Sequence, residues 1–123
     1  MAAPADRQRI AWEFAAAVNM TAAELRSWLR TDDSRRVGWK GRNGERRESV
    51  GHASGRAIAQ ILGKERQALT DADYAHMRKV VGFVRRHRAQ EPANIVTSRW
   101  RYSLMNWGHD PLKGSPPNAS GHP

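Results

Sequence analysis

The longest helix that the sequence predicts lies in residues 70–92, TDADYAHMRKVVGFVRRHRAQEP. Thr70 is followed three residues later by Asp73, a pattern typical of a capping box at the start of a helix. Pro92 ends the stretch, because proline disfavours helical geometry in the residue before it. Apolar residues recur between these ends at spacings of three and four: Tyr74, Met77, Val81 and Val84. This stretch therefore predicts an amphipathic helix that packs on a core.

The other side of the same helix is strongly basic. On a helical projection Lys79 and Arg86 lie roughly opposite the apolar face, and Arg78 and Arg85 flank it. The whole chain of 123 residues carries 21 Lys and Arg against 12 Asp and Glu, a net charge of +9. An excess of this size favours a polyanionic partner, either nucleic acid or an anionic membrane surface.

Composition also limits the class of protein. The chain is long enough for one domain with a modest core and too short for two independent domains. It contains no cysteine, which excludes disulfides and zinc sites built on cysteine. No apolar run approaches the roughly 18 residues of a membrane span, and the N-terminus has no signal-peptide pattern. We therefore expect a soluble cytoplasmic protein.

Four shorter helices follow from the same periodicity, so we expect an all-α domain of about five helices. They lie in residues 6–19, 21–31, 49–63 and 97–108. Asp6 and Thr97 are possible N-caps, and Thr21 with Glu24 forms a second capping box. Trp12 lies off the apolar stripe of the first helix, and we expect it to widen the buried face rather than to contact a partner.

A long basic, glycine-rich loop is predicted between the second and third helices, in residues 35–51, RRVGWKGRNGERRESVG. It has no helical period and no phosphate-loop signature, but Trp39 lies among cations. Aromatic rings stack on bases while cations neutralise phosphates, so this loop is a candidate binding element. The alternative is a mobile surface loop with Trp39 folded back on the core. We expect the domain to comprise residues 1–113, and residues 114–123 have the composition of a disordered tail.

Candidate catalytic and metal-binding residues are few. Asp32 and Asp33 are adjacent and have no third ligand at a useful spacing. His76 and His87 lie eleven residues apart, too far to share one metal, and we expect them to be solvated or to cap the helix. Three residue types of a hydrolase triad lie close in sequence: Ser103, His109 and Asp110. Because the usual motifs of nucleophilic and metal-dependent enzymes are missing, we expect no enzyme activity, metal or cofactor.

Five segments of the chain resemble a family of small proteins of unknown function found in bacteria and fungi. The segments are TAAELRSWLRTDDS (21–34), VGW (37–39), ESVGHASGR (48–56), HMRKVVGFVRRHRAQ (76–90) and RWRYSLMNWGHDPLK (99–113). The resemblance covers roughly residues 10–113, and the last segment is the most specific. Members of this family are often labelled as DNA-binding proteins. The resemblance therefore implies a DNA-binding role, and it brings no catalytic residues with it.

These observations predict a non-enzymatic protein that binds nucleic acid, with DNA favoured over RNA, little sequence specificity and a place on the nucleoid. The candidate binding residues are Arg35, Arg36, Trp39, Lys40, Arg42, Arg46, Arg47, Arg56, Arg78, Lys79, Arg85, Arg86, Arg99 and Arg101. Arg56 and Gln60 share the solvent face of the third helix, where such side chains are equally normal without a partner. We expect the other cations to form one continuous phosphate-binding surface. The alternative is an adaptor whose basic face and tryptophans bind an acidic protein.

Overall fold

The computed structural model describes residues 4–37 and 48–113, and within these ranges the chain is helical with no strand. The helices are α1 Pro4–Ala17, α2 Ala22–Leu29, α3 Asp32–Arg36, α4 Val50–Leu62, the short 3₁₀-helix η1 Arg66–Ala68, α5 Asp71–Arg88 and α6 Arg99–Asn106. The all-α fold class is therefore confirmed. Five candidate residues of the predicted loop lie outside the described ranges: Trp39, Lys40, Arg42, Arg46 and Arg47. The predicted tail, residues 114–123, lies outside them too.

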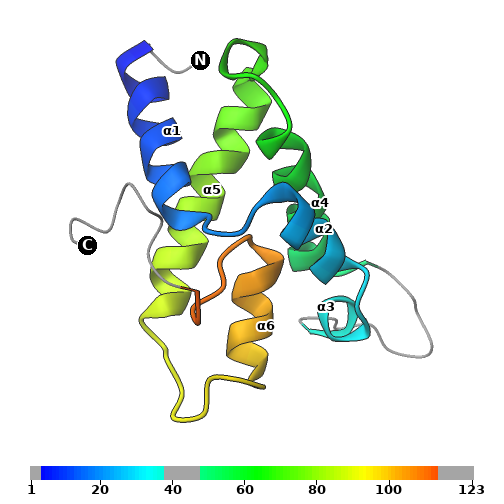
Figure 1. The fold of residues 1–123 in the computed structure, drawn as a ribbon. Helices are drawn as coiled ribbons and strands as arrows, with labels where there is room; N and C mark the ends of the chain where they lie inside the picture. Colours follow the sequence, from blue (N-terminus) through cyan, green and yellow to red (C-terminus); the bar gives the residue numbers. More distant parts are fainter. Residues whose placement is uncertain (1–3, 38–47, 114–123) are drawn as a thin grey trace.

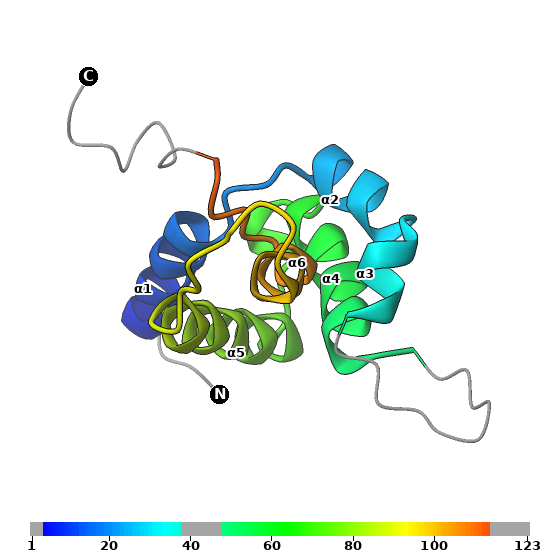
Figure 2. The same ribbon diagram turned by 90° about the horizontal axis from the view of Figure 1, so that it is seen from below.

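The helices form two pairs with α6 between them. α1 packs along α5, and α2 packs on α4 (Figure 1). α6 contacts both pairs, through α2 and α4 on one side and α5 on the other, and it also contacts α3 (Figure 2). α1 is the outermost helix along one edge in both views. The helix nearest the C-terminus is therefore the central one.

The core is built from one face of each long helix. α5 buries the four residues that its periodicity predicts: Tyr74, Met77, Val81 and Val84. It also buries Val80. α1 and its C-terminal extension bury Ile10, Phe14 and Val18. Leu25 and Leu29 of α2, Ile58, Ala59 and Ile61 of α4, and Trp100 and Leu104 of α6 complete one continuous cluster with Trp107. The apolar stripe that the sequence predicts for α5 therefore identifies its buried face correctly.

Side-chain caps determine where the helices begin. Both predicted capping boxes are present: Thr21 with Glu24 at α2, and Thr70 with Asp73 at α5. Ser98, rather than Thr97, caps α6 by accepting a hydrogen bond from the backbone N–H of Arg101 at 3.1 Å. α1 begins at Pro4, so Asp6 lies in its first turn and is not its cap. There its carboxylate interacts favourably with the positive end of the helix dipole.

The prediction of about five helices misses α3. Thr31 accepts a hydrogen bond from the backbone N–H of Ser34 at 3.1 Å and so caps a short helix that begins within TDDS, residues 31–34. Serine, threonine and aspartate favour both turns and helix N-termini, which explains the error. Arg35 and Arg36 therefore end a helix rather than begin a loop. Val50 and Gly51 belong to α4 in the same way, so the predicted loop boundaries at residues 35 and 51 are wrong.

Two further predictions about helices are wrong. Trp12 is 75% exposed, because Ile10 and Phe14 turn the opposite face of α1 into the core. The sequence predicts that α5 runs up to Glu91, the residue before Pro92, but the helix ends at Arg88.

No helix within residues 4–37 and 48–113 is long and apolar enough to cross a membrane.

Candidate nucleic-acid interface

The exposed side of α5 carries four cations, Arg78, Lys79, Arg85 and Arg86, which we call the α5 basic face. Within the described ranges, Arg85 is the member with an ion pair, a 3.5 Å contact with Glu13 of α1. The acidic residues of α5, Asp71 and Asp73, both lie in its first turn and are paired with Arg7 and Lys64. Beyond that turn, the exposed surface of α5 therefore carries positive charge that no acidic residue of the same helix offsets.

Arg101 does not belong to this surface. Its Nε and Nη2 donate to the two carboxylate oxygens of Asp110 at 3.1 Å each, and its Nη1 donates to the carbonyl of Val96 at 2.8 Å. The Arg101 side chain is only 19% exposed, unlike the other candidate cations within the described residues. Arg99 is the first residue of α6 and is exposed. The two arginines that flank Trp100 in sequence therefore have different roles.

Asp110 remains ionised because of these contacts. Burial by itself raises the pKa of the carboxyl group. The hydrogen bonds from Arg101 and from the backbone N–H of Leu112 outweigh burial, so the pKa of Asp110 is lowered. A bidentate pair of this kind is rigid and its charges cancel, which suits it to holding the fold rather than to binding phosphate.

Arg56 is also compensated. Its Nε and Nη2 donate to the carboxylate of Glu48 at 2.7 and 2.5 Å. Glu48 contacts His52 as well, and the other ring nitrogen of His52 lies 2.8 Å from the carbonyl oxygen of Leu29 at the end of α2. Hydrogen bonding from Arg56, aided by His52, outweighs burial and lowers the pKa of Glu48 to about 2. This cluster joins α2 to the start of α4.

Replacing Glu48 with glutamine is expected to cost about 1 kcal/mol of stability near neutral pH, because the pair is partly exposed to solvent. The carboxyl pKa is lower in the folded state than its ordinary value of 4.5, so its contribution is present above about pH 4.5. The contribution is lost as the pH falls towards about 2. Urea unfolding of both proteins across this range should show two stability curves that converge in acid. Curves that stay parallel would contradict the assignment.

A second group of exposed cations lies on and next to α2 and α3. It consists of Arg26 of α2, Arg30 at the C-terminal cap of α2, and Arg35 and Arg36 of α3. Figure 2 shows α5 on one side of α6 and the α2–α3 region on the other. Within the described residues, the predicted cations therefore lie on helices on more than one side of α6. The candidate residues from the sequence do not include Arg26 and Arg30, although both lie within the helix predicted over residues 21–31.

The C-terminal segment RWRYSLMNWGHDPLK holds the helices together through its asparagine. Asn106 is 1% exposed, and its side-chain Nδ2 donates to the carbonyl of Ser34 at 3.0 Å. Its Oδ1 accepts hydrogen bonds from Nε1 of Trp28 at 2.8 Å and from the hydroxyl of Ser34. One buried amide therefore joins α6 to both α2 and α3.

The residues after α6 bind back to the end of α1. Gly108 has a φ of +82°, a conformation that favours glycine, and its carbonyl accepts from the N–H of Met20 at 3.2 Å. Asn19 and Asp110 exchange two hydrogen bonds, of 2.8 and 3.0 Å, through the backbone of Asp110. Residues 108–110 thus close the fold over the α1–α2 connection. The role of the C-terminal segment in these contacts is to hold the helices of the fold together.

His109 completes this closure. Its Nδ1–H donates to the carbonyl of Ala17 at 2.7 Å, which leaves Nε2 as the acceptor for Nη1 of Arg88 at 3.2 Å. Burial lowers the pKa of His109 and so favours the neutral ring that this arrangement needs. Ser103, His109 and Asp110 do not hydrogen-bond to one another as a triad would, because each of the last two binds other groups of the fold.

His76 and His87 belong to a stack of five rings between α5 and α6. The order is His76, Trp107, Phe83, His87 and Trp100. The two inner contacts have centroid distances of 4.3 and 4.9 Å. Burial lowers the pKa of both histidines, which favours neutral rings in this apolar setting. The expectation that these histidines are solvated or cap the helix is wrong, because the side of α5 that carries them faces α6 and the residue after it.

Ser54 and His76 show the spacing of a nucleophile and its base, with 2.9 Å between the hydroxyl and Nε2. Ser54 is 4% exposed and packed inside the fold, so a substrate has no access to its hydroxyl. Asp32 and Asp33 are both exposed at the start of α3. Among the described residues, no three His, Asp or Glu side chains converge on a site for a metal ion.

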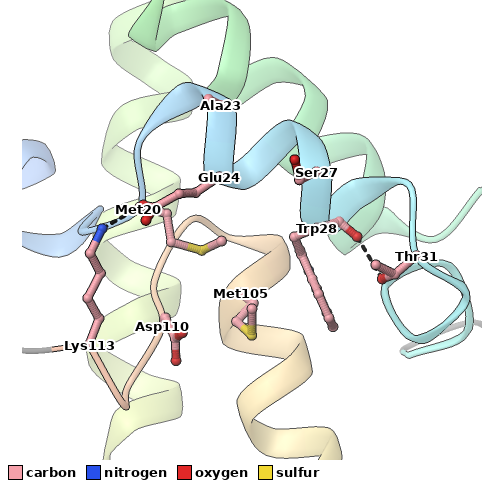
Figure 3. A pocket seen from close by; sticks show the side chains of 9 residues that line it. All are labelled: Met20, Ala23, Glu24, Ser27, Trp28, Thr31, Met105, Asp110 and Lys113. Carbon is pink, nitrogen blue, oxygen red and sulfur yellow. Dashed lines mark hydrogen bonds and ion pairs between the residues drawn. The ribbon is translucent and has the colours of Figure 1, made fainter.

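A groove of roughly 560 Å³ lies between α2 and the C-terminal segment, and Figure 3 shows its lining. Met20, Met105 and Trp28 supply apolar surface, and an ion pair between Glu24 and Lys113 borders one end. Its polar groups largely satisfy one another or neighbouring parts of the fold. The groove therefore offers apolar contact but few polar groups that could orient a small ligand.

Comparison with known proteins gives a family and no function. Residues 13–105 match the family model DUF3140, described as a protein of unknown function. Neither the comparison with curated proteins nor the comparison with solved structures found a match. The matched range extends from α1 into α6 and includes the whole of α5.

Proposed function

The chain belongs to the DUF3140 family, and we propose that it is a non-enzymatic nucleic-acid-binding protein that prefers DNA and has little sequence specificity. The observation that carries this proposal is the α5 basic face. Its four cations are exposed on one rigid helix, and the acidic residues of that helix lie away from them in the first turn. Helix-borne cations of this kind neutralise phosphates and release counterions, which drives binding without reading sequence.

The spacing along α5 suits a duplex. Lys79 and Arg86 are seven residues apart, as are Arg78 and Arg85, which corresponds to about 10.5 Å along a helix axis. The major groove of B-DNA is about 12 Å wide, so the two ends of this face can reach phosphates on both of its edges. Contacts of this type are made to the sugar–phosphate backbone of the DNA, and their spacing depends on the geometry of the duplex. We therefore propose duplex DNA as the preferred partner.

The test is fluorescence anisotropy with labelled duplex DNA, single-stranded DNA and RNA between about 50 and about 200 mM salt. The double variant Lys79→Glu/Arg86→Glu is expected to bind duplex DNA at least about tenfold more weakly than the wild type. It should also lower the steepness of the salt dependence by about 2 in log Kd against log salt, since each phosphate contact contributes about 0.9.

The matched control is Arg26→Glu/Arg30→Glu on α2, which changes the net charge by the same amount on the other side of the molecule. We expect it to stay within about threefold of the wild type, apart from the long-range effect of charge, which salt screens. Equal losses in the two variants would show that net charge, and not the α5 basic face, controls binding. Wild-type binding weaker than about 100 μM at physiological salt would overturn the proposed function.

An adaptor that binds an acidic protein is the second candidate. Trp12 supports it, because an exposed tryptophan is a common anchor of protein interfaces. Trp100 and Trp107 do not, since both are buried in the core and serve the ring stack. The anisotropy series separates the candidates, because an adaptor of this kind needs no steep salt dependence with nucleic acid.

A further inference from the structure

The outer face of α1 carries a tryptophan and three alanines although it faces solvent. Among residues 5–17 the exposed side chains are Ala5, Gln8, Arg9, Trp12, Ala15 and Ala16. The opposite face of the helix is already used, since it places Ile10 and Phe14 in the core. An exposed tryptophan flanked by alanines, on a helix whose other face is already buried, indicates a surface that can bind a partner. We propose that two copies of this chain pair through this face, as an antiparallel dimer with two-fold symmetry.

The position of α1 leaves this face accessible. α1 forms the outer edge of the fold in both views, with α5 along its inner side (Figures 1 and 2). Trp12, at 75% exposed, lies on the side away from the core. A second copy can therefore reach the whole length of the helix without displacing any other described element.

The charge of α1 favours a second copy over a polyanion. Its charged residues cancel: Asp6, Arg7, Arg9 and Glu13. Arg7 and Glu13 contact α5, and Asp6 and Arg9 lie 3.5 Å apart as a pair near the outer face. In a chain with a net charge of +9, this neutral helix is where two copies can approach with little repulsion. A nucleic acid would find no excess of cations here.

The order of residues on α1 fits an antiparallel pair. Arg9 precedes Trp12 by about one helical turn. When two helices cross antiparallel about a point midway between these residues, Arg9 of each copy meets Trp12 of the partner subunit. The guanidinium can then lie over the indole face, and the two-fold axis makes this cation–π contact twice. On either side, Ala5 opposes Ala16 of the partner subunit, and such small residues let the helices approach closely.

Sedimentation velocity of the full chain, at a salt concentration that screens its net charge, tests the dimer over about 1 to about 300 μM protein. The wild-type mass should rise with concentration from 13.9 kDa towards twice that value. Trp12→Glu should remain at 13.9 kDa throughout, with an unchanged helical CD spectrum. The matched control is Val50→Glu, which puts the same charge on another exposed apolar residue, 77% exposed on α4, and should dimerise like the wild type.

Disulfide trapping tests the antiparallel register, and the absence of native cysteine makes it specific. An oxidised mixture of Ala5→Cys and Ala16→Cys chains should give mainly the mixed dimer, and each variant alone should cross-link poorly. Efficient cross-linking of either variant with itself would contradict the antiparallel register. A wild-type mass of 13.9 kDa at every concentration, or a Trp12→Glu variant that dimerises normally, would overturn the proposal.

Discussion

Replacing Asn106 with leucine is expected to lower the free energy of unfolding by about 3 to 5 kcal/mol, a large part of the total stability of a small domain. Leucine has a similar size but cannot accept from Nε1 of Trp28 or donate to the carbonyl of Ser34. Both groups would be left without their partner in the interior, and a buried group that loses its partner costs about 1 to 3 kcal/mol. Urea denaturation followed by CD measures the change, since Trp28 fluorescence would respond to the substitution itself.

Gln60→Leu is the matched control for this substitution. It replaces another side-chain amide with leucine, at an exposed position on α4. Surface substitutions of this kind change stability by about 0.5 kcal/mol or less. If Asn106→Leu unfolded at the same urea concentration as the wild type, the buried network would contribute nothing net, and the role assigned to the C-terminal segment would fail.

A methyl group at Gly55 is expected to destabilise the protein by about 2 to 3 kcal/mol, although alanine is the better helix former by about 1 kcal/mol. The new Cβ would lie 2.6 Å from the backbone oxygen of Asn106 and 2.6 Å from Cδ2 of Leu29. The leucine can rotate, but a backbone oxygen moves only if α4 and α6 separate. Such a separation would disturb the core on both sides. Thermal and urea unfolding of Gly55→Ala measure the loss.

Gly82→Ala is the matched control and should have the opposite sign. Its Cβ would meet only the Nη1 end of Arg86, at 3.1 Å, and that flexible side chain can move into solvent. The gain in helix propensity should then stabilise the protein by up to about 1 kcal/mol. Equal effects at the two glycines would show that the close contact between α4 and α6 does not limit the packing.

Local signals predict the helices well because they depend on neighbours in the chain. The capping box at Thr70 and Asp73 and the apolar stripe of α5 are both present as the sequence indicates. α3 was missed because its signals, from Thr31 to Ser34, are shared between turns and helix starts. The burial of Trp12 was misjudged because position on a helix, and not the size of the side chain, decides which residues face the core.

The candidate site depends on contacts that no local pattern carries. The sequence shows Arg101 and Arg86 as equivalent cations, but nine residues beyond Arg101 lies Asp110, which binds it. The stacking of His76 and His87 likewise depends on α6, a separate part of the chain. Periodicity correctly placed Arg86 and Lys79 on the exposed side of α5. Their role in binding nucleic acid remains the prediction that the charge-reversal variants test.

The central place of α6 also sets the time at which the protein can fold during synthesis. A ribosome releases the chain from its N-terminus at about 5 to 20 residues per second, so α1 to α5 emerge before the helix that joins them. Until residues 99–110 leave the exit tunnel, the faces of α2, α4 and α5 that contact α6 in the finished fold have no partner. The core can therefore be completed only after residues 99–110 have emerged, and until then the apolar faces that α6 covers are open to aggregation.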